Sequence, residues 1–293
     1  MPSLHSFAVP VQSPFDWEYL LAFLRVRATP GVETVTGSGY ERTITDGAES
    51  QTLSVTYDCI SATLQIAHSG DAAARSMVES RAKQIFKPNV DTRPIEAFLS
   101  RDAWLGGFVM RQVGLRMPGG WSAFEISVRA VLGQQISVPA ATTLIGRLVR
   151  ATGTRLRETS WLFPTAEQVA QSNLAGLGVP ASRLETVKTL AAFFAENGDD
   201  CLTQEKIKDR LLALKGIGKW TAGYILMRTG HDHDHWPEGD LILRKALSKK
   251  KEMIAHADLE EAFSQWSPYR SYATIHIWRG FVPLAKTLNR GKL

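Results

Sequence analysis

The sequence predicts an α+β protein in which a small antiparallel sheet precedes an all-helical body. Short segments rich in Val, Thr, Ile and Tyr are confined to the first 88 residues of the 293-residue chain. From residue 91 onward, apolar residues recur almost throughout at helical spacing. The length allows one large domain or two to three small ones with a buried core.

The first part is predicted to be a helix, a meander of strands and a second helix. The first helix spans 15–27, where Trp17 and Leu24 lie on one apolar stripe. The second helix spans 71–86 and stops at Lys87-Pro88. Between them, Gly and Asp residues separate four predicted strands, over 32–36, 40–45, 51–57 and 62–67. Nothing in this part suggests catalysis.

The remaining 200 or so residues are predicted to be helical, with Gly and Pro between most of the helices. The predicted helices span 92–101, 103–112, 121–133, 137–152, 165–172, 181–197, 203–213, 219–229, 240–248, 257–265 and 268–287. No low-complexity segment and no fixed-period repeat interrupts them.

Composition excludes some classes of protein and permits others. No apolar run reaches 18 residues, so no membrane span is predicted, and the first residues do not have the pattern of a signal peptide. The net charge of +5 permits nucleic-acid binding without requiring it. Cys59 and Cys201 lie far apart, which gives neither a zinc spacing nor a four-cysteine iron–sulfur site. Both are expected to be reduced thiols in the cytoplasm.

One stretch, 211–247, contains a tight turn between two predicted helices. Gly216 and Gly218 permit positive φ angles and close backbone approach. The amides that follow them can bind a phosphate at the helix N-terminus, with a charge from Lys219 and a hydroxyl from Thr221. A simple join between two helices is the more ordinary role of such a glycine pair, so the turn alone does not establish DNA binding.

The wider pattern resembles a known superfamily. An L-x-G-I-G-x-W-T-A segment is followed about 20 residues later by P-x-x-D, as in the helix-hairpin-helix (HhH-GPD) DNA glycosylases. PFDWEYLLAFLRVRATPGVETV near the start, AFEISVRAVLGQQIS at 123–137 and WSPYRSYATIHIW at 266–278 resemble its AlkA-type, or DNA-3-methyladenine glycosylase II, family. The resemblance covers nearly the whole chain.

This resemblance implies an organisation and an activity. The sheet domain, residues 1–90, would resemble half of a TATA-binding protein. Residues 91–120 with 233–293 would form one helical domain, and 121–232 another that carries the hairpin at 203–229. The activity would be excision of alkylated bases such as 3-methyladenine and 7-methylguanine from double-stranded damaged DNA. Two alternatives remain. The protein is a glycosylase for deaminated or oxidised bases, or it is a non-catalytic module that binds damaged DNA.

The catalytic residue implied is Asp240, a carboxylate that would stabilise the positive charge on the sugar when the base leaves. From the residues alone, Asp240 is equally an N-cap of the following helix. The resemblance implies base-pocket roles for Trp220, Tyr224, Trp278 and Phe23. Trp220 and Tyr224 share a helix face, where core packing is the ordinary role of aromatic residues.

Position 220 also distinguishes two mechanisms. Bifunctional members of the superfamily have a Schiff-base lysine at the matching position, and here it is Trp220. Lys219 is one residue early, which turns it about 100° around the helix. The resemblance therefore implies a monofunctional enzyme, which removes the base and leaves an abasic site without cutting the strand.

Gln135 matches the position of the wedge that fills the hole left by a flipped base, although the best-known family members have an apolar residue there. A polar residue capping the next helix is the alternative role. The resemblance also implies a monovalent cation bound, with DNA, by the backbone carbonyls of Leu212, Leu214 and Ile217.

The tract His231-Asp232-His233-Asp234-His235 is interpreted as a solvated loop rather than a metal site, and Lys249-Lys250-Lys251 as a solvated basic face. No other cofactor is expected. The protein is expected to be a cytoplasmic, nucleoid-associated monomer that contacts no membrane.

Overall fold

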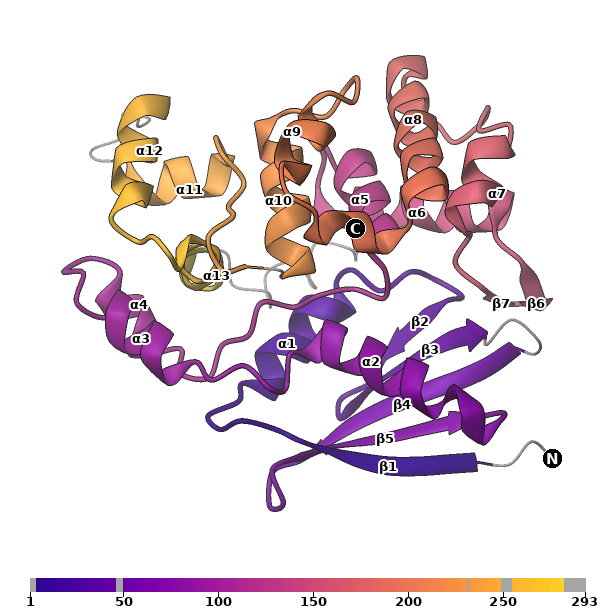
Figure 1. Cartoon of the computed structure of the whole chain (residues 1–293), viewed down its shortest axis with the longest axis horizontal. Coiled ribbons are helices and arrows are strands. Elements are labelled where there is room, and N and C mark those ends of the chain that lie inside the picture. The colour runs from indigo at the N-terminus through magenta and orange to yellow at the C-terminus, as the bar shows by residue number, and fades with distance from the viewer. Residues whose placement is uncertain (1–3, 46–49, 231, 249–254, 282–293) are drawn as a thin grey trace, which may run out of the picture.

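The computed structural model describes residues 4–45, 50–230, 232–248 and 255–281. A five-stranded sheet forms one side of the molecule and the helices form the other (Figure 1). This confirms the predicted fold class, an antiparallel sheet followed by a helical body.

The sheet is antiparallel throughout, with the strand order β1-β5-β4-β3-β2. Its strands are β1 (Leu4–Pro10), β2 (Glu33–Val35), β3 (Gly39–Thr45), β4 (Ser50–Asp58) and β5 (Thr63–Ser69). Side chains alternate between the two faces, so Val55 and its partner Ile66 are buried while the neighbouring Thr56 is exposed. Strand β1 was not predicted, and it pairs with β5, nearly sixty residues away in sequence.

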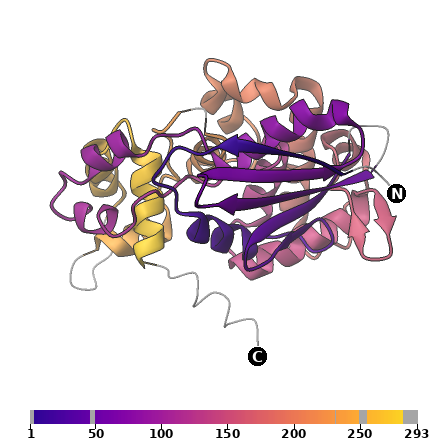
Figure 2. The same ribbon diagram turned by 90° about the horizontal axis from the view of Figure 1, so that it is seen from below.

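Two helices cover one face of this sheet. They are α1 (Trp17–Arg25) and α2 (Arg75–Phe86), the latter preceded by the 3₁₀ turn η1 (Ala72–Ala74). Their apolar residues, among them Leu20 and Ile85, pack with the buried faces of β3, β4 and β5. The opposite face of the sheet is turned to the viewer in Figure 2.

The helical body follows the predicted order of elements. It consists of α3 (Arg93–Leu99), α4 (Gly106–Val109), α5 (Ala123–Leu132), α6 (Val138–Thr152), α7 (Ala166–Gln171), α8 (Ala181–Asn197), α9 (Ile207–Leu212), α10 (Lys219–Thr229), α11 (Leu241–Leu247), α12 (His256–Ser264) and α13 (Arg270–Phe281), with a 3₁₀ turn η2 (Asp199–Thr203) and a hairpin of β6 (Arg155–Arg157) and β7 (Ser160–Trp161).

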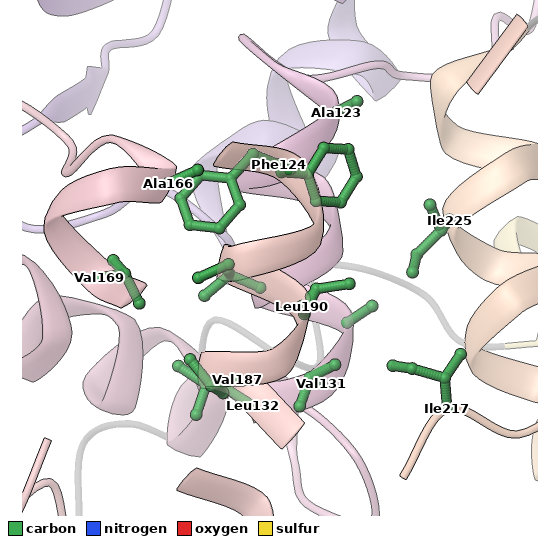
Figure 3. Packing of buried hydrophobic residues seen from close by; sticks show 14 of the residues in the cluster. Ala123, Phe124, Val131, Leu132, Ala166, Val169, Val187, Leu190, Ile217 and Ile225 are labelled. Atoms are coloured by element: carbon green, nitrogen blue, oxygen red, sulfur yellow. The ribbon is translucent and has the colours of Figure 1, made fainter. Parts of the chain in front are cut away.

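Four hydrophobic clusters of described residues organise this architecture, and the smallest of them contains Phe23 and Met227. One lies in the sheet domain between Val9 and Phe86. A second joins α5 to α10, and in it Ile217 and Ile225 lie across from Val131 and Leu190 (Figure 3). The third combines two distant parts of the sequence, residues 95–109 and 236–277.

Several predicted boundaries are wrong for local reasons. The predicted helix 103–112 shortens to α4, which begins at the Gly106-Gly107 pair. The predicted helix 203–213 begins instead at Ile207, because Lys206 adopts a left-handed conformation with φ of 60°. Residues 282–287 of the last predicted helix lie outside the described residues. No described helix is long and apolar enough to cross a membrane.

Candidate active site

The turn between α9 and α10 requires its first glycine. Gly216 has a φ of +87°, a region that favours glycine, and an added Cβ would lie 2.0 Å from Oγ1 of Thr186. Ile217, which follows it, is 5% exposed and packs into the α5–α10 cluster. The buried side chain of Ile217 therefore anchors the turn, and the close packing of Gly216 against Thr186 of α8 sets its conformation.

The N-terminus of α10 is open to an anion. Gly218 is its N-cap residue and supplies no side chain to bond the first-turn amides. Those amides have no acceptor within the helix, and the helix dipole adds positive potential at the same end. This end of α10 can bind a phosphate group through backbone N–H groups alone.

The two side chains expected to assist there differ in orientation. Lys219 is 68% exposed and lies 3.7 Å from the carboxylate of Glu238. Thr221 is 3% exposed, and its hydroxyl accepts a hydrogen bond from the Gln134 amide at 2.9 Å. The expected outward hydroxyl of Thr221 is thus turned inward, and this residue offers a phosphate its backbone amide. The Gln134 amide also bonds the Gly216 carbonyl at 3.1 Å, which ties the α5–α6 loop to the turn.

Asp240 is held by four N–H groups. Its Oδ1 accepts from the backbone amides of Ile242 and Leu243 at 3.0 and 3.1 Å, so it does cap α11. The same oxygen accepts from the indole of Trp278 at 3.1 Å, and Oδ2 accepts from the indole of Trp220 at 2.9 Å. The carboxylate is 8% exposed and lines a cavity. Capping and a position in the candidate site therefore coexist in one residue.

Aromatic residues line the cavity beside this carboxylate. The rings of Trp220 and Tyr224 stack with centroids 5.2 Å apart and planes 12° apart. Trp278 lies across from Tyr224 with its centroid 6.2 Å away. All three residues are half-buried and line the cavity, so their rings face the cavity as well as packing against their neighbours.

This cavity has a volume of about 1120 Å³ and lies between the sheet domain and the helical body. Helices α1, α5, α6, α10 and α13 and the start of α11 contribute to its lining. We call it the base cavity. It brings together Phe23, Trp220, Tyr224, Asp240 and Trp278, the pocket and catalytic residues expected from the sequence.

Two arginines in the base cavity were not identified from the sequence. The guanidinium carbon of Arg27 lies 3.7 Å from the centroid of the Phe23 ring, and that of Arg228 lies 4.7 Å from it. Phe23 is 2% exposed, so its ring serves mainly as a platform for these cations. The helical spacing does contain a signal, since Arg27 follows Phe23 by four residues and Arg228 follows Tyr224 by four.

The two guanidiniums also act on Tyr224. Nη1 of Arg228 donates to its hydroxyl at 2.6 Å. Burial alone would raise the pKa of this phenol, but the charges of Arg228 and Arg27 outweigh burial and lower that pKa. By contrast, burial raises the pKa of Tyr19, which also lines the cavity, to about 12.

A buried ion network joins the sheet domain to α5 along the lining of the base cavity, where Nη1 of Arg129 also donates to the Arg27 carbonyl at 2.8 Å. Nη2 of Arg129 lies 2.6 Å from a carboxylate oxygen of Glu33 and 2.6 Å from one of Glu125. Arg42 completes the network 3.1 Å from Glu125. Burial opposes ionisation of Glu33, but Arg129 and Arg42 prevail and hold its pKa at about 2.

The α5–α6 loop presents the expected wedge position to solvent. Gln135 is exposed and has a φ of 60°, while its neighbour Ile136 is 37% exposed and lines the base cavity. The helix after the loop is capped by Ser137, whose side chain accepts from the Ala140 amide. Gln135 is therefore not the residue that caps α6.

The histidine tract is only partly the solvated loop that was predicted. Asp232 is exposed, residues 233–235 are partly buried, and His231 lies outside the described residues. Arg270 of α13 bonds both carboxylate oxygens of Asp234 at 2.8 and 2.7 Å, and the ring of His233 packs edge-on against Tyr272 at 5.2 Å. These contacts dock the segment against α13. The described residues contain no cluster of three metal-binding side chains. The predicted basic face at 249–251 lies outside the described residues.

Comparisons with known proteins identify relatives along nearly the whole chain. The AlkA N-terminal domain model matches residues 6–122. A probable bifunctional transcriptional activator/DNA repair enzyme AlkA of Mycobacterium tuberculosis is 33% identical over 282 residues, covering 93% of this chain. This chain spans only 56% of that relative's length. DNA-3-methyladenine glycosylase 2 of Escherichia coli is 30% identical over 276 residues, with 91% of this chain and 94% of that protein covered.

A solved structure shows the same fold. The 3-methyladenine DNA-glycosylase of Archaeoglobus fulgidus superposes with a TM-score of 0.81 at 20% identity, and covers 93% of this chain and 97% of its own. At this identity the likeness concerns the fold alone.

Proposed function

Because the chain belongs to the AlkA family of DNA-3-methyladenine glycosylases, we propose that it is a monofunctional DNA glycosylase for alkylated bases. It flips a damaged nucleotide into the base cavity and hydrolyses its C1′–N bond. The products are the free base and an intact strand with an abasic site, as base-excision repair requires. The position of Asp240 in the base cavity, between the indoles of Trp220 and Trp278, carries this proposal.

The role of Asp240 follows from the charge that develops in the reaction. When the C1′–N bond breaks, its electron pair leaves with the base and the sugar becomes an oxocarbenium-like cation. A carboxylate fixed beside that cation stabilises it without reorganising during the reaction. Water then attacks C1′ and releases a proton. A base alkylated at N3 or N7 of a purine is already cationic, so it leaves without a strong general acid.

A Schiff-base mechanism has no suitable amine at the matching position. Trp220 occupies it and bonds Asp240 through its indole. The neighbouring Lys219 is mostly exposed and faces Glu238, and it does not line the base cavity. These observations support hydrolysis without strand cleavage.

We infer that the turn before α10 binds the DNA backbone. The contacts would be made to phosphates rather than to bases, by the backbone amides near Gly216, Gly218 and Thr221 and by the charge of Lys219. The affinity for DNA should therefore fall as the salt concentration rises, and should depend little on sequence. Gln135 would enter the duplex where the flipped nucleotide was, positioned by the bond between Gln134 and the turn.

A monovalent cation would fit the same turn. Leu212 ends α9, where terminal carbonyls have no partner within the helix. The Leu214 carbonyl accepts from the Ile217 amide at 3.0 Å and retains a second lone pair. With the Ile217 carbonyl, these oxygens would coordinate a cation that offsets phosphate charge when DNA is bound. No other cofactor is proposed, and we expect a cytoplasmic monomer that acts on duplex DNA.

The test is release of free base from methylated duplex DNA, with strand integrity followed in the same samples. We expect 3-methyladenine and 7-methylguanine in the supernatant, and strands that break only after hot alkali. Borohydride should trap no covalent protein–DNA complex. If neither base is released, the proposed glycosylase activity is wrong; if borohydride traps the protein on DNA, the monofunctional mechanism is wrong.

A further inference from the structure

Two cations lie together in the base cavity at a distance from the catalytic carboxylate. Trp220, Tyr224 and Arg228 are spaced four residues apart on α10, so Arg228 lies about 12 Å along the helix from Trp220, the partner of Asp240. Arg27, two residues after the end of α1, reaches the same place and rests on Phe23 beside Arg228. The base cavity therefore has an anion at one end and a pair of guanidiniums at the other.

Arg228 is fixed in place by its hydrogen bonds. Its Nη2 donates to the Gly119 carbonyl at 2.8 Å, its Nε donates to the Pro118 carbonyl, and its Nη1 donates to the Tyr224 hydroxyl. Arg228 is 6% exposed, so this cation cannot turn out into solvent.

Arg27 is held more loosely. Its Nη1 donates to the Phe23 carbonyl at 3.2 Å, and its other contacts are the Phe23 ring and the Tyr224 hydroxyl. It therefore keeps N–H groups available toward the cavity that it lines.

The carboxylates that line the base cavity do not neutralise this pair. Glu33 and Glu125 are both engaged by Arg129 at 2.6 Å, and Asp240 is bonded to Trp220, about 12 Å along α10 from Arg228. Within the described part of the chain, no ion pair joins Arg27 or Arg228 to a carboxylate. A cationic base stacked on Tyr224 would meet two like charges in a site of low dielectric constant.

We propose that Arg27 and Arg228 are specificity-determining residues that favour neutral modified bases with a carbonyl acceptor over cationic N-alkyl purines. The repulsion weakens binding of a cationic base, whereas an exocyclic oxygen of a neutral base gains charge-assisted hydrogen bonds. Cationic bases remain substrates, because their glycosidic bond is already weakened. This inference rests on the proposed glycosylase function and assigns its preference among lesions to two residues.

The test compares three single-lesion duplexes that differ in charge and acceptor. 7-Methylguanine is cationic and has an exocyclic oxygen, hypoxanthine is neutral with that oxygen, and 1,N6-ethenoadenine is neutral without one. Single-turnover rates at subsaturating protein would be measured for wild type, Arg27→Met and Arg27→Gln. Arg101→Met is the control, since Arg101 is exposed and does not line the base cavity.

Removing the charge should raise the 7-methylguanine rate relative to hypoxanthine about tenfold in both Arg27 variants, as expected for loss of one screened unit charge, because both bases have the exocyclic oxygen and they differ in charge. Only Arg27→Met should also lower the rate of hypoxanthine release relative to that of ethenoadenine, because the glutamine of Arg27→Gln keeps an N–H donor. Arg101→Met should leave both ratios within about twofold of wild type, since its charge lies outside the cavity.

Unchanged ratios in the Arg27 variants would overturn the inference. If a thermal melt shows that Arg27→Met is not folded, Arg27→Gln still measures the effect of the charge, and that measurement alone tests the inference. Failure of the proposed function itself looks different, because wild type would then release none of the three bases.

Discussion

The indole N–H of Trp220 donates to Oδ2 of Asp240 at 2.9 Å, across twenty residues of sequence. One wall of the base cavity is thereby attached to the candidate catalytic group. Since Oδ1 accepts from the indole of Trp278, the aromatic walls and the carboxylate form one hydrogen-bonded unit. The pocket residues are expected to orient Asp240 as well as to contact the base.

This attachment predicts that Trp220→Phe slows catalysis while keeping an aromatic wall. Loss of a hydrogen bond to a charged acceptor should lower the single-turnover rate about tenfold. Affinity for DNA containing an abasic-site analogue should change little. Trp278→Phe is the matched variant for the other oxygen. A rate equal to that of wild type in both variants would show that the indole bonds do not orient the acid.

The turn before α10 provides a stability prediction with an internal control. Gly216→Ala should lower the free energy of unfolding by about 1–3 kcal/mol, because the residue is left-handed and its Cβ would collide with Thr186. Gly218→Ala should cost much less, since its φ is −94° and its Cβ would meet nothing within 4 Å. Urea denaturation of both variants tests this, and equal losses would contradict the packing described for the turn.

The ion network between the domains predicts a pH dependence of stability. The pKa of Glu33 is lowered from 4.5 to about 2, so its ionised form stabilises the native state above pH 4.5. That contribution should disappear as the pH falls from 4.5 toward 2.

Glu33→Gln isolates this contribution. At neutral pH the variant should be about 3 kcal/mol less stable than wild type, because removal of one buried partner leaves arginine charge uncompensated. Denaturation at a series of pH values should show the two proteins converging toward pH 2. A constant difference would mean that Glu33 contributes no ionisable stabilisation.

The α5–α6 loop predicts how flipping depends on Gln135. Gln135→Gly keeps the φ of 60° accessible but removes the side chain, so base release and flipping should slow about tenfold. Gln135→Leu should retain most of the rate, because an apolar side chain can also fill the vacated space. A 2-aminopurine beside the lesion would report flipping by fluorescence. Equal flipping in wild type and Gln135→Gly would remove Gln135 from the wedge role.

Much of the fold could be predicted from local pattern. Helices over 181–197 and 219–229 have the bounds that were predicted, since apolar periodicity and the terminal residues Gly198 and Gly230 define them. Strand β1 and the hairpin of β6 and β7 were missed. β1 depends on its pairing with β5, and the Gly31 carbonyl accepts a hydrogen bond from the Trp161 amide of β7. Such contacts between distant segments leave little trace in a short stretch of sequence.

In the candidate site, too, the features within one continuous stretch were predicted and the contacts between distant segments were missed. The register from Trp220 to Asp240 was readable because both residues belong to one continuous motif. Arg27 and Arg228 were missed because their significance arises where α1 meets α10 over the Phe23 ring. The docking of Asp234 against Arg270 was missed for the same reason, as α13 lies 36 residues further along the chain.

The most direct measurement is the single-turnover rate of 7-methylguanine release by wild type and Asp240→Asn, alongside binding to duplex DNA with an abasic-site analogue. Asparagine can still cap α11 through its side-chain oxygen, but it carries no charge to stabilise the sugar cation. We predict a rate lower by a hundredfold or more, on the order expected for loss of transition-state charge stabilisation, with binding retained. Full activity of Asp240→Asn would contradict the central role of this carboxylate.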